Sequence, residues 1–142
     1  MTTGLLLVAH GSPIQVANQD LFLLVEQLRC RCDYEVIEPA FLEGAMPSIP
    51  DGIAACVDKG VRRVVIIPYF LLPGKHVAED LPRFVEHARR QHAEVEFVLA
   101  EPLRFSHRLG QAVLRRIEEA NVLQWKAETA ERGERHGSDG DV

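Results

Sequence analysis

Three side chains that can bind metal ions or transfer protons recur at one interval along the chain. They are His10, Glu43 and His76, and each lies 33 residues from the next. Two imidazoles and a carboxylate suit divalent transition metals such as Fe, Co, Ni or Zn. The same groups can accept protons near neutral pH. The three residues therefore predict a site for metal binding or acid–base chemistry, provided that the fold brings them together.

Each of these residues also has an ordinary structural interpretation. A histidine at a strand end is often a hydrogen-bonded loop residue, and a glutamate at the start of a helix favours the helix dipole. The remaining histidines give weaker signals. His87 and His92 are expected on a solvated helix face, His107 at a helix start facing solvent, and His136 by itself near the C-terminus.

The elements that must position these residues form a repeating pattern. Short apolar runs typical of buried parallel strands alternate with stretches of helical periodicity. The expected strands are residues 4–9, 34–41, 61–72 and 94–100, and the last helix is expected at 106–123. The order predicts an α/β fold with a four-stranded parallel sheet, right-handed crossovers and helices on both faces, as in doubly wound three-layer folds.

Ligands of such sheets bind beyond the carboxyl ends of the strands, and this rule places the three candidates. His10 follows the first expected strand, Glu43 the second and His76 the third. Because the spacing equals one strand–helix unit each time, we expect the three side chains at equivalent heights on successive units.

Composition limits the domain organisation and the function classes. The 142 residues are expected to form one α/β domain over 1–125, and the loss of apolar periodicity from Lys126 predicts a disordered tail over 126–142. A net charge of −5 argues against a non-specific nucleic-acid binder, which needs a basic surface. No apolar run approaches the roughly 20 residues of a membrane span.

Cysteine usage and the first residues suggest a compartment. Met-Thr-Thr-Gly lacks the features of a signal peptide, so a cytoplasmic protein is expected. Cys30, Cys32 and Cys56 are accordingly interpreted as reduced thiols, since three cysteines cannot all pair within one chain.

The turn after the first expected strand, His10-Gly-Ser-Pro13, resembles no nucleotide-binding loop. It has neither the glycines and lysine of a phosphate-binding loop nor a G-x-S-x-G nucleophile elbow. A small turn between strand and helix can still present backbone N–H groups to an anion, which makes Ser12 a candidate substrate-binding residue.

Three motifs in order resemble the sirohydrochlorin chelatases. They are Leu7-Val-Ala-His-Gly-Ser12, then Phe41-Leu-Glu43 with Pro47-Ser-Ile49, then residues 65–76 continuing to Asp80-Leu-Pro82. The resemblance covers about residues 4–120 and is strongest to the short, single-domain CbiX-type members.

The resemblance implies an activity and a set of residues. The expected reaction inserts Co²⁺ or Fe²⁺ (Ni²⁺ in some archaeal relatives) into the tetrapyrrole sirohydrochlorin, with the metal as substrate and no organic cofactor. His10 and His76 match the catalytic histidines of the family, and Glu43 is the matching candidate for an added carboxylate ligand. Lys75 beside His76 is a candidate contact for the carboxylates of the substrate.

The size of the substrate favours a partner subunit. A flat macrocycle about 10–15 Å across needs two walls, because ligand sites bury most of the ligand. One four-stranded domain offers one wall, so a homodimer with facing strand ends is expected.

Two other functions use similar residues. A histidine phosphatase also has a His-Gly pair after its first strand, but it needs an arginine where this chain has Ala9. A non-catalytic carrier of metal or tetrapyrrole would use the same ligands as a chelatase, and only turnover separates the two.

Overall fold

The computed structural model describes residues 2–137, which form four strands and four helices in alternation. The elements are β1 (Thr3–Ala9), α1 (Gln15–Arg31), β2 (Val36–Phe41), α2 (Ile49–Asp58), β3 (Arg63–Pro68), α3 (Lys75–Gln91), β4 (Glu96–Leu99) and α4 (His107–Gly137). The chain divides into two compact units, one ending at Arg104 and the other beginning at Phe105. The sheet lies in the first unit.

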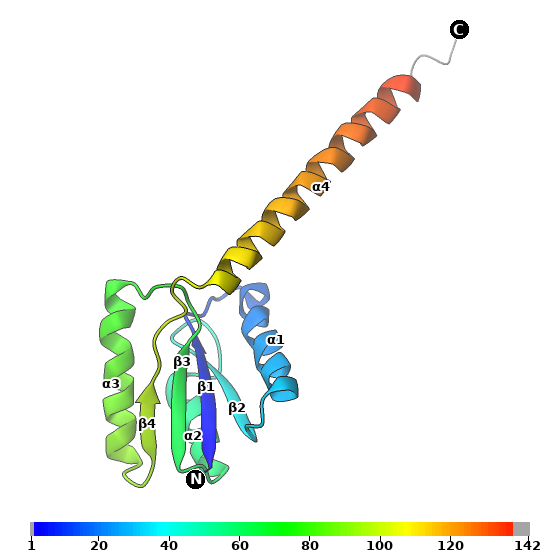
Figure 1. The fold of residues 1–142 in the computed structure, drawn as a ribbon. Coiled ribbons are helices and arrows are strands. Elements are labelled where there is room, and N and C mark those ends of the chain that lie inside the picture. Colours follow the sequence, from blue (N-terminus) through cyan, green and yellow to red (C-terminus); the bar gives the residue numbers. More distant parts are fainter. Residues whose placement is uncertain (1, 138–142) are drawn as a thin grey trace. The chain divides into compact units, whose positions relative to one another are not determined.

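All four strands are parallel, in the order β2-β1-β3-β4 (Figure 1). β1 is central and pairs with two neighbours, so that Val8 lies opposite Ala40 on one side and Pro68 on the other. The predicted fold class is therefore confirmed. The register brings the carboxyl ends of β1, β2 and β3 to one edge of the sheet.

Successive strand residues point to opposite faces of the sheet, and each face has its own core. One face packs against α1, and its cluster includes Leu5, Leu7, Leu21, Val25, Ile37 and Phe41. The other face packs against α2 and α3, and its cluster includes Leu6, Val8, Ile53, Val64, Ile66 and Val85. Helices thus cover both faces, as continuous apolar strands require.

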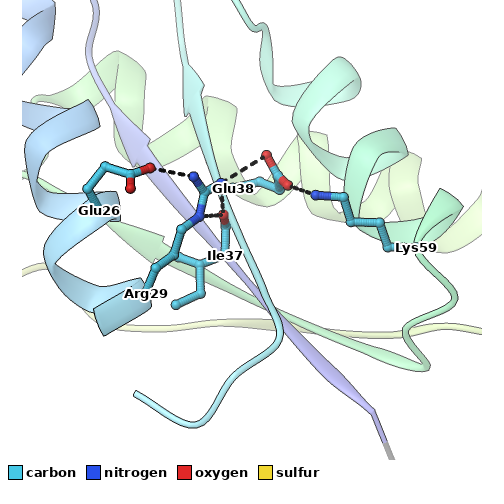
Figure 2. Close-up of polar contacts among 5 residues, drawn as sticks. All are labelled: Glu26, Arg29, Ile37, Glu38 and Lys59. Atoms are coloured by element: carbon cyan, nitrogen blue, oxygen red, sulfur yellow. Dashed lines mark hydrogen bonds and ion pairs between the residues drawn. The ribbon is translucent and has the colours of Figure 1, made fainter. Parts of the chain in front are cut away.

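A polar network stabilises the edge strand β2 (Figure 2). Arg29 of α1 donates from Nε and Nη2 to the carbonyl of Ile37, at 3.2 and 2.7 Å. The largely buried Glu38 lies between Arg29 and Lys59 and forms an ion pair with each. Arg29 also pairs with Glu26 one turn away. Side chains from α1 and from the end of α2 therefore bind the strand that has only one neighbour in the sheet.

The second unit differs from the sequence-based prediction. In place of a disordered tail from Lys126, α4 continues to Gly137, and residues 138–142 lie outside the described residues. The structural boundary accordingly falls after Arg104 and not after residue 125. The segment lacks leucine and isoleucine, but it is rich in Ala, Glu, Arg and Lys, which are strong helix formers. Pairs four residues apart, such as Glu131 with Arg135, add local support.

No helix between residues 2 and 137 combines the length and apolar character needed to cross a membrane.

Candidate active site

Two loops at the carboxyl edge of the sheet are joined by their backbones. Beyond the last residues of β1 and β2, the N–H of Leu42 donates to the carbonyl of Ala9 at 3.0 Å. The N–H of Glu43 donates to the carbonyl of His10 at 3.1 Å. These hydrogen bonds continue the pairing of the two strands into the loops, so His10 and Glu43 lie side by side.

The side chains of this pair also meet. Nε2 of His10 lies 3.0 Å from Oε1 of Glu43. The side chains are 59% and 71% exposed, so the pair is open to solvent and to any ligand at this edge. Two ligands on adjacent positions of one metal ion, each at about 2.1 Å, are roughly 3 Å apart. The geometry therefore suits either a shared metal ion or proton exchange between imidazole and carboxylate.

Two glycines allow the loops to approach this closely. Gly11 has a φ of +91°, and a Cβ at this position would lie 1.8 Å from the carbonyl oxygen of Glu43. Gly44 has a φ of +71°, and its Cβ would lie 3.0 Å from the backbone carbon of Ser12. Both positions therefore require glycine, for backbone conformation and for space.

A buried amide fixes the start of the loop that follows His10. The N–H of Ser12 donates to Oδ1 of Asn18 at 3.0 Å, and Nδ2 of Asn18 donates to the carbonyl of Ser12 at 2.7 Å. The hydroxyl oxygen of Ser12 accepts from the N–H of Ile14 at 3.1 Å. The backbone N–H of Ser12 is therefore already bonded to Asn18, and the suggestion that Ser12 binds substrate stays a prediction.

Sequence reasoning did not single out Asn18. The side chain is 8% exposed and lies on the inward face of α1 with Leu21 and Val25. A polar residue on that apolar stripe, three positions before Leu21 and seven before Val25, was the available signal. Buried amides need partners, and a loop backbone supplies them here.

The structure places the third candidate differently from the expectation. His10 follows β1 by one residue and Glu43 follows β2 by two, whereas His76 lies eight residues beyond the end of β3. His76 is the second residue of α3 and is exposed, as is Lys75 before it. The three residues therefore do not follow their strands at equal separations, because β3 ends at Pro68 and a loop intervenes before α3.

The predicted three-ligand cluster does not form in the described part of the chain. Residues 2–137 contain no group of three or more His, Cys, Asp and Glu side chains placed to hold a metal ion. The structure brings together His10 and Glu43 and leaves His76 outside that pair.

The remaining histidines differ in exposure. His87 is exposed as expected, whereas His92 follows the last residue of α3 and lies partly buried, its ring 6.2 Å from that of Phe97. His107 is exposed at the start of α4, and the side chain of His136 is outside the described residues.

The three cysteines are free thiols. Cys56 is buried under the sheet, and burial, with a smaller contribution from Glu38, raises the pKa of its thiol to about 12.

Known proteins resemble this chain in sequence. Residues 4–120 match the CbiX family. The chain is 35% identical over 100 residues to a chloroplastic sirohydrochlorin ferrochelatase from Arabidopsis thaliana, covering 70% of this chain and 44% of the relative. It is 30% identical over 119 residues to a sirohydrochlorin ferrochelatase from Priestia megaterium, covering 84% and 45%. The chain thus spans about half the length of these curated relatives.

Solved structures resemble it in fold and sequence. SirB from Bacillus subtilis subspecies spizizenii, a sirohydrochlorin chelatase in complex with cobalt, superposes with a TM-score of 0.79 at 27% identity, covering 84% of this chain and 51% of SirB. A CbiX protein from Marinobacter aquaeolei VT8 gives a TM-score of 0.72 at 29% identity, covering 83% and 96%. With a family match over residues 4–120 and a common fold, the chain belongs to the CbiX family.

Proposed function

We propose that the chain inserts a divalent metal ion, Co²⁺ or Fe²⁺, into sirohydrochlorin. The observation that supports this most directly is the His10–Glu43 pair, 3.0 Å apart at the strand ends of a CbiX-family domain. Relatives are named sirohydrochlorin ferrochelatase and sirohydrochlorin cobaltochelatase, and SirB structures contain cobalt or Fe³⁺. The metal is a substrate in this proposal, and no organic cofactor takes part.

The chemistry of insertion fits the pair. The free macrocycle must lose two pyrrole protons, and the incoming metal must lose water ligands. An imidazole and a carboxylate can bind one ion or accept those protons. Two protein ligands leave most coordination positions to water and then to the macrocycle, so the ion is held loosely enough to be transferred. His76 enters the proposal as a second catalytic histidine from the sequence motif, and Lys75 as a contact for substrate carboxylates.

The same proposal includes a homodimer in the cytoplasm. The exposure of His10 and Glu43 supports a second wall supplied by another copy of the chain, because a chelatase must surround a flat macrocycle. Light scattering of the purified protein should give the mass of a dimer. A fully active monomer would mean that one domain holds the macrocycle by itself.

Anaerobic turnover tests the proposed reaction. Purified protein should accelerate Co²⁺ or Fe²⁺ insertion above the spontaneous rate, measured by the change in absorption of the macrocycle. Many turnovers per protein molecule would exclude a stoichiometric carrier of metal or tetrapyrrole. A rate equal to the spontaneous rate with both metals would show that the chain is not the proposed enzyme.

Three variants test the residues. His10→Ala and His76→Ala should each lose about 10²–10⁴-fold in rate, the usual contribution of a positioned acid–base group. Glu43→Gln should weaken binding of the metal substrate. His87→Ala is the matched control, because this histidine is exposed and lies in the C-terminal half of α3. Because His10 and Glu43 are exposed, their variants should change the free energy of unfolding by less than about 1 kcal/mol.

A further inference from the structure

A groove of about 480 Å³ lies directly beside the His10–Glu43 pair. One wall is the first two turns of α1, and the other is the segment Gly44–Met46. Both walls continue the loops of the pair, because Gly44 follows Glu43, and Pro13, which also lines the groove, follows Ser12. A ligand in the groove would therefore extend from the pair along α1.

The lining is neutral and has two kinds of side chain. None of the residues lining the groove is charged. Phe22 and Met46 supply apolar surface and are 43% and 69% exposed, and the Phe22 ring packs 5.6 Å from the buried ring of Phe41. A supported aromatic ring and a thioether on an open surface suit contact with a flat, conjugated ligand.

The polar part consists of amides on one face of α1. Gln15 and Gln19 are four residues apart, so their side chains lie on the same helix face. Among residues 2–137 neither amide has a hydrogen-bond partner, whereas the amide of Asn18 between them is used by Ser12. Two amide NH2 groups, with two N–H donors each, therefore remain available on the groove wall.

These features match a ligand that is both flat and rich in carboxylates. The chain has a net charge of −5, so an acidic ligand needs a local surface without negative charge. Amide N–H groups can donate to carboxylates and carry no charge themselves. We infer that this groove binds one edge of the tetrapyrrole, with Gln15 and Gln19 donating to its peripheral carboxylates and Phe22 and Met46 contacting the ring. The inference rests on the proposed function and assigns specificity-determining residues to it.

The test measures binding of metal-free sirohydrochlorin, followed by the fluorescence of the macrocycle. The double variant Gln15→Ala/Gln19→Ala should raise the Kd about a hundredfold, since two hydrogen bonds to charged groups are lost and each corresponds to about tenfold or more. The KM for sirohydrochlorin should rise with it, while kcat and the KM for the metal stay near wild type. The double variant Gln15→Glu/Gln19→Glu should raise the Kd further, and added salt should reduce that excess.

The matched control is Gln27→Ala, an exposed glutamine of α1 that does not line the groove. It should bind like wild type. A Kd within twofold of wild type for Gln15→Ala/Gln19→Ala would overturn the inference. If the wild-type protein binds sirohydrochlorin but does not turn it over, the proposed chelatase reaction is rejected. The Kd values of the variants still decide whether the groove binds the macrocycle. Wild-type protein that does not bind sirohydrochlorin would overturn both.

Discussion

The Cα of Gly11 lies so close to Glu43 that a Cβ on Gly11 would be 1.8 Å from the carbonyl oxygen of Glu43. The loops after β1 and β2 are therefore in direct backbone contact at the point where His10 and Glu43 project. Since both side chains are largely exposed, the backbones hold the pair in place and side-chain burial contributes little.

This contact predicts that Gly11→Ala destabilises the protein and separates His10 from Glu43. The new methyl group cannot fit against backbone, so we expect a loss of at least about 3 kcal/mol in urea unfolding. Gly60→Ala is the matched control, since Gly60 has a similar φ of +83° but nothing within 4 Å of its Cβ position. It should lose only the 1–2 kcal/mol or so of a left-handed backbone. Equal losses in the two variants would show that the contact with Glu43 is unimportant.

Asn18 is predicted to stabilise the loop that follows His10. Asn18→Ala leaves both backbone groups of Ser12 without their partner, which should lower the free energy of unfolding by about 1–3 kcal/mol. Asn18→Asp keeps the acceptor for the Ser12 N–H but places a buried carboxylate oxygen against the Ser12 carbonyl, so it should lose at least as much. Asn121→Ala, at an exposed position of α4, should stay within about 0.5 kcal/mol of wild type. An Asn18→Ala variant as stable as this control would contradict the positioning role.

The two hydrogen bonds from Arg29 to Ile37 predict that charge by itself cannot replace this arginine. Arg29→Ala should cost about 1–2 kcal/mol in urea unfolding, because the side chain is partly exposed. Arg29→Lys should recover little of this, since an ammonium cannot reproduce the planar fork of donors. Arg31→Ala removes an exposed arginine from the same helix end and should be neutral. Full recovery in Arg29→Lys would mean that the ion pairs with Glu26 and Glu38 matter and the carbonyl contact does not.

The buried thiol of Cys56 leads us to expect that the protein loses stability at alkaline pH. Burial raises the pKa of the thiol in the folded protein from 9.0 to about 12, while the thiol of the unfolded chain ionises near its ordinary pKa. The unfolded state therefore binds fewer protons between these values. The stabilising contribution of the protonated Cys56 thiol is therefore complete below pH 9. It is lost as pH rises toward 12, where the free energy of unfolding falls by up to about 1.4 kcal/mol per pH unit.

Urea unfolding at several pH values checks this, with variants that separate the thiols. Cys56→Ala should flatten the decline above pH 9, whereas Cys30→Ala, which removes an exposed thiol, should leave it unchanged. A thiol reagent should likewise modify Cys30 rapidly in the native protein and Cys56 only after unfolding. An equal decline in the two variants would assign the pH dependence to other groups.

The sequence by itself predicted the four strands, their parallel direction and the positions of His10 and Glu43 after the strand ends. Nearly apolar runs such as residues 4–9 and 64–72 are long enough to indicate buried strands, and the alternation with helices leaves few possible topologies. His10 and Glu43 follow their strands almost directly, so the position of each strand end fixes them. The composition of residues 126–137 was less informative, because a highly charged segment can be a helix as well as a disordered tail.

Only the tertiary structure decided which candidates meet. Equal spacing along the chain did not place His76 with the other two, because the distance from the end of β3 depends on where the loop gives way to α3. The commitment of the Ser12 N–H to Asn18 could not be predicted either, since it depends on which face α1 turns toward the loop. The close approach of Gly11 to Glu43 joins residues 32 positions apart, and only the pairing of β1 with β2 brings those two backbones into contact.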